Sequence, residues 1–353
     1  MNRIFENTEN AFALKSNAEL ERAYFLFKLI SIEPLVKIGT SVTNFAIRAK
    51  LPVEGLIRTT VFDHFCGGVS ESDCMPVVEK MWNKGVSTIL DYSVEGKDTE
   101  DPLDDALSKT LEIMDFVKQK EAIPFAVFKP TGYGRLALYE KKGRAQKLSA
   151  AEQSEWDRVV RRFDQTCKKA YDLNVPLLID AEESWMQDAA DDLVEEMMRA
   201  YNTKAPIVFN TLQMYRWDRI DYLGGLMERA QKDGFKIGIK FVRGAYLEKE
   251  NERAAERGYP SPMCTTKQAT DENFDNAVAW SLDYLDHMAV YAGTHNEKSS
   301  YRLMEQMEKR QISRNDPRIW FGQLYGMSDH ISFNMGTLGY NVSKYLPFGP
   351  VRD

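Results

Sequence analysis

Short β-branched runs alternate with amphipathic segments from residue 85 to the end of the chain. This alternation is typical of successive β/α units that build a parallel sheet. Eight parallel strands separated by helices favour an α/β fold of the closed (β/α)8-barrel, or TIM, type over an open sheet. The eight strands are expected at Ser87–Tyr92, Pro124–Lys129, Pro176–Ala181, Pro206–Gln213, Lys236–Val242, Met288–Gly293, Arg318–Leu324 and Val342–Pro347.

The first 84 residues have a helical pattern instead. Apolar residues recur at three- and four-residue spacing from Ala11 to Ile32, and the Gly67-Gly68 pair interrupts the pattern. We therefore expect an N-terminal helical arm (1–84) packed against a barrel domain (85–353). The chain ends at Asp353, directly after the eighth expected strand. The final helix of the barrel is therefore expected to be missing, as in a truncated barrel.

Composition narrows the class of partner. The chain has 46 basic and 53 acidic residues, a net charge of −7, with both signs mixed along its length. A nucleic-acid surface would need a basic face, so a small-molecule partner is expected. The four cysteines form no C-x-x-C pair, which argues against a metal site and favours the reducing cytoplasm. No apolar run approaches the ~18 residues of a membrane span, and peripheral contact with the inner face of a membrane stays open.

Polar residues follow several of the expected strands. In a barrel of this type the active site lies at the carboxyl ends of the strands, so such residues are candidates for function. Five strands supply them: Lys129 at the end of the second, Asp180 at the end of the third, Gln213 at the end of the fourth, Thr294-His295-Asn296 at the end of the sixth, and Gln323-Leu324-Tyr325 at the end of the seventh.

The end of the fifth strand is the most informative segment. It reads Lys240-Phe241-Val242-Arg243-Gly244-Ala245-Tyr246, with two cations three positions apart, followed by small residues. Alternation sends Lys240 and Val242 to one face of the strand, and Arg243 lies near its exit, where a guanidinium can bind a phosphate. Gly244 and Ala245 leave room for a ligand to approach the backbone. A structural ion pair with Asp180 or Glu182 explains the cations equally well.

Ordinary structural roles stay open for some of these side chains. Glu183 could simply begin a helix, because acidic residues favour helix N-termini. Gln213 could be an ordinary amide side chain at the barrel rim, and Tyr345 could be an ordinary aromatic residue of the barrel. A role at a helix N-terminus suits Asp180 less well, since Asp180 ends an otherwise apolar strand. His295 is a candidate because polar residues flank it at a strand end.

Five motifs in order along the chain resemble the proline dehydrogenase family. They are Ile179–Glu183 (IDAEE), Lys240–Tyr246 (KFVRGAY), Gly293–Asn296 (GTHN), Gln323–Met327 (QLYGM) and Tyr345–Gly349 (YLPFG). Each motif is weak alone, but together they cover nearly the whole barrel. The chain is most similar to the stand-alone bacterial type of the family.

The resemblance implies a flavoprotein that oxidises L-proline to 1-pyrroline-5-carboxylate by hydride transfer from C5 to flavin N5, the first step of proline catabolism. It implies FAD as cofactor, a quinone as electron acceptor, and no metal. The residues it implies for FAD are Lys240 and Val242 near N5, Gln213 at the pyrimidine end, Arg243 at the pyrophosphate with Gly244 and Ala245 beside it, and Thr294, His295 and Asn296 along the ribityl–adenosine part.

Around proline, the resemblance implies that Lys129 pairs with the carboxylate, that Asp180 orients cationic neighbours, and that Tyr246, Leu324 and Tyr345 enclose the ring. The chain departs from the family pattern in two ways. Lys240 stands where many members have arginine, and a final helix with an Arg-Arg pair for the substrate carboxylate is missing. We therefore expect weak proline binding beside a largely intact FAD site.

Three alternatives remain from the sequence. A hydroxyproline dehydrogenase would share the motifs, but the phenol of Tyr345 leaves little room for a hydroxyl and favours proline. A Schiff-base lyase would use the amine of Lys129 or Lys240 as its nucleophile. A ligand-binding barrel without catalytic activity would need neither flavin nor a reactive lysine.

Overall fold

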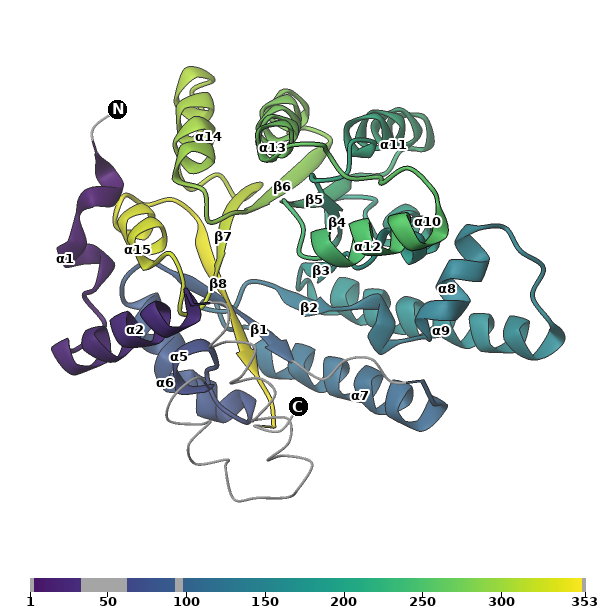
Figure 1. Cartoon of the computed structure of the whole chain (residues 1–353), viewed down its shortest axis with the longest axis horizontal. Coiled ribbons are helices and arrows are strands. Elements are labelled where there is room, and N and C mark those ends of the chain that lie inside the picture. The colour runs from purple at the N-terminus through teal and green to yellow at the C-terminus, as the bar shows by residue number, and fades with distance from the viewer. Residues whose placement is uncertain (1–2, 33–61, 93–97, 351–353) are drawn as a thin grey trace.

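The computed structural model describes residues 3–32, 62–92 and 98–350, and these form a nearly closed barrel (Figure 1). Hydrogen bonds join eight parallel strands in the order β1-β8-β7-β6-β5-β4-β3-β2, and a parallel bridge between Ile89 and Phe125 brings β1 to β2. The predicted (β/α)8 architecture is therefore confirmed. The strands are β1 (Ser87–Tyr92), β2 (Ala126–Phe128), β3 (Leu177–Ile179), β4 (Val208–Gln213), β5 (Ile237–Val242), β6 (Met288–Gly293), β7 (Ile319–Leu324) and β8 (Val342–Phe348).

The strands β2 and β3 are shorter than the sequence pattern predicts. Pro124 and Pro176 lack the amide hydrogen that a strand needs for its ladder, so each precedes its strand instead of starting it. At the other end of β2, Lys129 is already the residue before a 3-10 turn, η3 (Pro130–Gly132). The polar residues after these two strands therefore lie on loops at the barrel rim.

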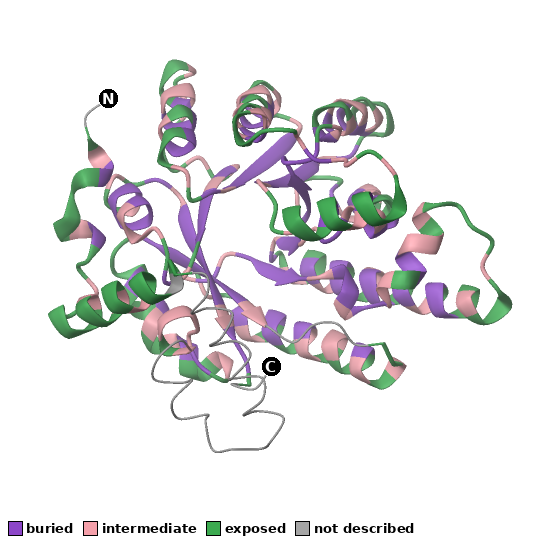
Figure 2. Cartoon of the chain, in the orientation of Figure 1, coloured by how far each residue is buried: buried purple, intermediate pink, exposed green. Residues whose placement is uncertain are grey.

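Helices surround the barrel and turn their apolar faces toward it. Figure 2 shows buried strands at the centre and helices whose outer faces are exposed. The helices that cover the wall are α7 (Glu100–Val117), α9 (Ala150–Leu173), α10 (Ser184–Tyr201), α11 (Arg219–Asp233), α13 (Lys267–Ser281), α14 (Glu297–Lys309) and α15 (Asp329–Thr337). Two additional helices, α8 (Leu136–Gly143) and α12 (Leu247–Arg257), lie between β2 and α9 and between β5 and α13.

Local sequence signals set the helix ends. A capping box begins α9, because Ser149 and Glu152 each accept a hydrogen bond from the other's backbone amide. Helix α11 ends at Gly234, which has a φ of 79°. This helix begins at Arg219, because upstream of it the backbone of Arg216 forms a bridge with Met263.

The N-terminal segment is partly integrated into the barrel wall. Helix α1 (Thr8–Ala11) packs on α15. The ring of Phe27 on α2 (Asn17–Ile30) contacts Phe65 of α5 (Asp63–Phe65), which precedes the expected Gly67-Gly68 break. Helix α6 (Glu71–Trp82) packs on β1, and its residues Cys74, Val78 and Met81 belong to the main core. The Gly67-Gly68 pair hydrogen-bonds to the end of β8 at 2.8 and 3.1 Å. Helix α6 thus lies where β1 and β8 meet.

Two predictions about the chain ends stay predictions. Residues 33–61 of the expected arm lie outside the described residues, and so does the C-terminal segment 351–353. No helix follows β8 among residues 98–350. In the described part of the chain, none of the helices combines the length and the apolar character that a membrane crossing requires.

The barrel interior is filled mainly by aromatic side chains. Phe125 makes edge contacts with the rings of Phe209, Tyr291 and Trp320 at centroid distances of 5.2–5.8 Å. The hydroxyl of Tyr291 forms a 2.8 Å hydrogen bond with Ser343. This packing depends on Gly322, because a Cβ there would lie 2.0 Å from the Tyr291 hydroxyl oxygen.

The substitution Gly322→Ala is expected to destabilise the fold by about 2–3 kcal/mol, because the barrel interior cannot yield that much space. Gly224→Ala is the matched control, since Gly224 lies in α11 with no atom within 4 Å of the added Cβ. It should stabilise by about 0.5–1 kcal/mol through helix propensity. Chemical denaturation measures both changes. Equal effects of the two variants would contradict the packing argument.

Candidate active site at the carboxyl ends of the strands

A cavity of about 610 Å³ lies at the carboxyl ends of the strands. Its size falls in the range of about 300–1,000 Å³ that is usual for small-molecule sites. Every residue that the family resemblance implies for FAD or proline lines it: Lys129, Asp180, Gln213, Lys240, Val242, Arg243, Gly244, Ala245, Tyr246, Thr294, His295, Asn296, Leu324 and Tyr345. The strand-end candidate Tyr325 does not line it. The motifs are far apart in sequence, and the barrel brings them to one place.

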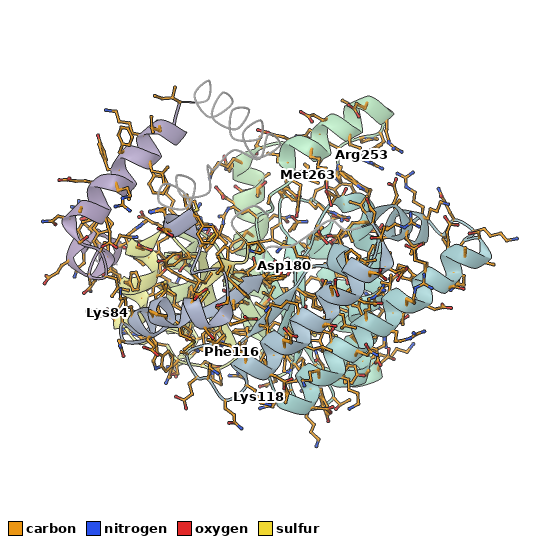
Figure 3. The ribbon with its side chains drawn as sticks, turned by 90° about the horizontal axis from the view of Figure 1, so that it is seen from below. Lys84, Phe116, Lys118, Asp180, Arg253 and Met263 are labelled. Carbon is orange, nitrogen blue, oxygen red and sulfur yellow. The ribbon has the colours of Figure 1, made fainter. Side chains whose placement is uncertain are left out.

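The cavity has a clear position along the barrel. In Figure 3, Lys84 before β1 and Lys118 before β2 lie toward the lower end of the molecule. Arg253 of α12, which follows β5, lies toward the upper end. Asp180 lies between them, near the middle of the view. Helix α12 is held at this rim, because the Glu250 carboxylate accepts hydrogen bonds of 2.6 Å from the amide and hydroxyl of Ser184.

Lys240 is the central charge of the cavity. Its ammonium is almost fully buried and donates hydrogen bonds to Asp180 and, at 2.8 Å, to the hydroxyl of Tyr345. The ammonium also lies 4.6 Å from the centroid of the Tyr345 ring. Burial and the nearby Asp180 carboxylate raise the pKa of Tyr345 well above its usual value, so the phenol stays neutral. The sequence left open whether the fifth-strand cations form a structural ion pair with Asp180, and Lys240 does form it.

A second lysine extends this cluster. The Lys129 ammonium lies 3.2 Å from Asp91 Oδ1 and 3.9 Å from Asp180 Oδ2. Asp180 thus contacts two ammonium groups, and two carboxylates alternate with two cations across the strand ends. Opposite charges within about 4–6 Å favour the ionised forms of both partners. The cluster can bind a carboxylate and an ammonium group of one small ligand, but it has no net charge.

Arg243 anchors the opposite part of the cavity. Its guanidinium donates to Asp271 (2.6 Å), Thr294 (2.7 Å) and Ser299 (2.8 Å), and it stacks 4.6 Å above the ring of Phe274. Partial burial acts to raise the pKa of Asp271, but hydrogen bonds from Lys267 and Arg243 lower it overall. Among the described residues, these contacts use three of the five N–H groups of the guanidinium and leave two for a ligand anion.

Small residues shape the wall between these two charged regions. Gly244 has a φ of 122°, and a Cβ there would lie 2.5 Å from the ring of Tyr215. Only glycine fits this position, and its backbone is accessible to the cavity. Gln213 is buried and donates a 2.6 Å hydrogen bond to the backbone carbonyl of Glu182, which fixes its amide at the cavity wall.

His295 faces the cavity from the loop after β6. The amide of Leu324 donates to its Nε2 at 3.4 Å, so the proton belongs on Nδ1, which donates to Ser328 at 2.9 Å. Desolvation, then the positive charge of Lys344 and the proximity of His330, lower the pKa of His295 to about 4. The imidazole is therefore neutral at physiological pH and serves as a hydrogen-bonding group.

The structure adds residues that the sequence argument missed. Asp91 on β1 is the most consequential, because it pairs with Lys129. The strand-end rule could have found it, since it is the only acidic residue in an otherwise apolar and hydroxylic strand. The other lining residues that it missed are Ala181, Thr211, Lys267, Tyr291, Gly293 and Gly322, while Gln323, already a candidate from the sequence, also lines the cavity.

A parallel barrel of eight strands, with paired charges around a cavity at their carboxyl ends, is the architecture of a (β/α)8-barrel enzyme. Comparison with known sequences narrows this class, because residues 74–353 match the family described as proline dehydrogenase. The chain therefore belongs to the proline dehydrogenase family, an oxidoreductase family, and the enzyme class predicted from the sequence motifs is confirmed.

Individual relatives differ in how much of their length is shared. The chain is 35% identical over 299 residues to the carbapenem antibiotics biosynthesis protein CarD of Pectobacterium carotovorum subsp. carotovorum, covering 84% of this chain and 77% of the relative. It is 39% identical to human mitochondrial proline dehydrogenase 1 over 210 residues, which are 59% of this chain and 35% of the human protein. Mitochondrial proline dehydrogenase 1 of Arabidopsis thaliana is 29% identical, covering 99% of this chain and 78% of the relative.

Solved structures show the same fold. Proline utilization A (PutA) from Bdellovibrio bacteriovorus, inactivated by N-propargylglycine, superposes with a TM-score of 0.72 at 19% identity, covering 99% of this chain. The chain spans 35% of that much longer protein.

The titration of His295 tests the electrostatics of the cavity. Its pKa of about 4 predicts no ionisation near pH 6.5 in an imidazole NMR titration. An unfolded histidine binds its proton near pH ~6.5, so His295 costs stability as the pH falls from that value toward its folded pKa. His295→Gln should reduce this acid-induced loss. A His295 resonance that titrates at an ordinary pH would contradict the assignment.

Proposed function

We propose that this protein oxidises L-proline to 1-pyrroline-5-carboxylate with bound FAD. The observation that carries the proposal is the cluster of Lys129, Asp180, Lys240 and Tyr345, because it combines both charges of a zwitterion site with a neutral aromatic wall. Family membership supports the reaction, and the cavity supplies residue types that suit it.

The residues along the cavity fit a dinucleotide such as FAD. Arg243 retains two N–H groups for a pyrophosphate, Gly244 offers backbone without a side chain, and Thr294, His295 and Asn296 place hydroxyl, imidazole and amide groups along one edge. Gln213 is held where it can hydrogen-bond to a heterocycle. Bound FAD would supply the acceptor for the hydride that leaves C5 of proline.

The remaining groups would bind and orient proline. Lys129 would pair with the carboxylate, while Tyr246, Leu324 and Tyr345 would enclose the ring and select against larger amino acids. Lys240 would stabilise negative charge that develops beside it during the transfer, because its ammonium is buried and fixed by two partners. Asp180 would hold both ammonium groups in place.

The proposal predicts weak proline binding by these 353 residues. Lys129 already faces two carboxylates, so part of its attraction for a ligand carboxylate is offset. Electron transfer to a quinone is a further part of the proposal that rests on the family resemblance. A cytoplasmic location rests on the cysteine pattern, and peripheral membrane contact is also proposed.

Two alternatives are less well supported. A Schiff-base lyase needs a lysine amine that is free to attack a carbonyl carbon, whereas Lys129 and Lys240 are both engaged in ion pairs with carboxylates. Hydroxyproline oxidation would need space beside Tyr345, whose hydroxyl is fixed by Lys240. Borohydride treatment with a carbonyl substrate would trap a covalent adduct only in the lyase.

The purified protein tests the proposed function directly. We expect it to be yellow, to release FAD on denaturation, and to lose its flavin colour when L-proline is added without oxygen. A colourless protein that cannot be reconstituted with FAD would rule out the proposal. Bleaching by hydroxyproline at least as fast as by proline would favour the hydroxyproline alternative.

The two basic residues of β5 and its exit should have separable effects. Lys240→Ala should slow flavin reduction by about 10²-fold or more while FAD binding changes little, because it removes charge stabilisation at the reacting centre. Arg243→Ala should chiefly lose FAD. Arg302→Ala is a matched control, since Arg302 pairs with Asp275 between α14 and α13 and does not line this cavity. Stopped-flow reduction and FAD titration would refute the assignment if the two effects were reversed.

A further inference from the structure

Glu182 is a buried acid whose side chain holds the loop that carries Lys129. The residue is 4% exposed and lies between β3 and α10. Its carboxylate accepts a 2.8 Å hydrogen bond from the Thr131 amide and a 2.6 Å hydrogen bond from the Thr131 hydroxyl. Thr131 follows Lys129 by two residues, so this contact fixes the backbone that presents the lysine.

The backbone of Glu182 makes further connections. Its carbonyl accepts the 2.6 Å hydrogen bond from Gln213, and its amide donates to Gln187 at 3.0 Å. Gln187 in turn donates to Asp191 at 2.8 Å. One residue therefore links the loop after β2, the loop after β3 and the end of β4.

The charge of Glu182 adds to the electrostatics around Lys129. Burial, opposed by the two hydrogen bonds from Thr131, raises the pKa of Glu182 to about 7. The ionisable groups that face it are Lys129 from the end of β2, Glu183 beside it and Tyr139 from α8. Its charge therefore changes near neutral pH.

Both protonation states of Glu182 are compatible with the observed contacts. The ionised acid accepts twice from Thr131. The neutral acid can still accept from the amide with one oxygen, and its own O–H can donate to the Thr131 hydroxyl, which acts as donor or acceptor. Protonation thus removes a negative charge from the vicinity of Lys129 without removing the link between the loops.

We propose that Glu182 is a positioning residue that holds Lys129 for a ligand carboxylate and whose charge weakens the binding of that carboxylate. This inference rests on the proposed function, because it assumes that the substrate carboxylate binds at Lys129. Asp91 and Asp180 offset the Lys129 charge at close range, and an ionised Glu182 adds a third negative charge. Carboxylate binding is therefore stronger when Glu182 is neutral.

The inference predicts a pH dependence with a definite sign. As the pH rises through the pKa of Glu182, the site gains a negative charge and the Kd of an anionic ligand rises. Glu182→Gln imitates the neutral acid, because its amide can accept from the Thr131 amide and donate to the Thr131 hydroxyl. Its Kd should therefore stay at the low-pH value of the original protein.

The test uses the FAD-bound protein and cyclopentanecarboxylate, which has the ring and carboxylate of proline but no amine that titrates or is oxidised. Calorimetry would give its Kd at about pH 6 and about pH 8, where the probe stays ionised. We expect the Kd of the original protein to rise about fivefold, the lower end of typical site-to-site couplings. Glu182→Gln should show no rise.

Glu183→Gln is the matched control, because Glu183 is also buried but pairs with Lys249 on α12. It should retain a pH-dependent Kd. Thermal unfolding would verify that both variants are folded. Equal pH dependence in Glu182→Gln and the original protein would overturn the inference, and so would a uniform loss of affinity at both pH values, which indicates a structural role alone.

The inference and the proposed function can fail separately. If L-proline reduces the flavin but the probe binds no form of the protein, the inference about Glu182 is wrong and the oxidation of proline stands. If the probe binds with the expected pH dependence but proline does not reduce the flavin, the reaction is wrong and the role of Glu182 stands.

Discussion

The ion pair between Lys240 and Asp180 depends on the pairing of β3, β4 and β5 and in turn defines the active end of the barrel. Lys240 lies on β5 and Asp180 follows β3, and β4 separates the two strands in the sheet. A buried charge is costly unless it is paired and hydrogen-bonded. Asp180 and the hydroxyl of Tyr345 meet this requirement for Lys240. The same contacts fix the phenol that forms one wall of the cavity.

The arrangement of charge explains what kind of ligand suits this cavity. Two ammonium groups and the two carboxylates of Asp91 and Asp180 alternate over short distances. Such a cluster matches a small zwitterion better than a simple anion, because each ligand charge finds an opposite partner. Arg243, on the other side of the small residues, has a separate set of partners and suits a phosphate group. The cavity therefore offers two regions with different charge arrangements, which the proposed function assigns to the substrate and to the cofactor.

Much of this could be predicted from the sequence because strand periodicity and strand-end residues are local signals. The eight strands follow from such signals, and so does the placement of residues Lys240–Tyr246 at the end of the fifth strand. The partner of Lys129 could not be predicted in the same way, since Asp91 lies 38 residues away and meets it only after β1 and β2 come together. The sequence offered Glu182 as an ion-pair partner of the fifth-strand cations, and the folded chain shows its side chain turned toward Thr131 instead. Long-range contacts of this kind leave no pattern in a single sequence.

The central claim is that this cavity positions C5 of L-proline for oxidation, and isotope substitution tests it most directly. Anaerobic reduction of the bound flavin would be timed with ordinary L-proline, with proline deuterated at C5, and with proline deuterated at C2. The account predicts slower reduction with the C5-deuterated substrate and an unchanged rate with the C2-deuterated one. Slower reduction with the C2-deuterated substrate alone, or no reduction by proline at all, would contradict it.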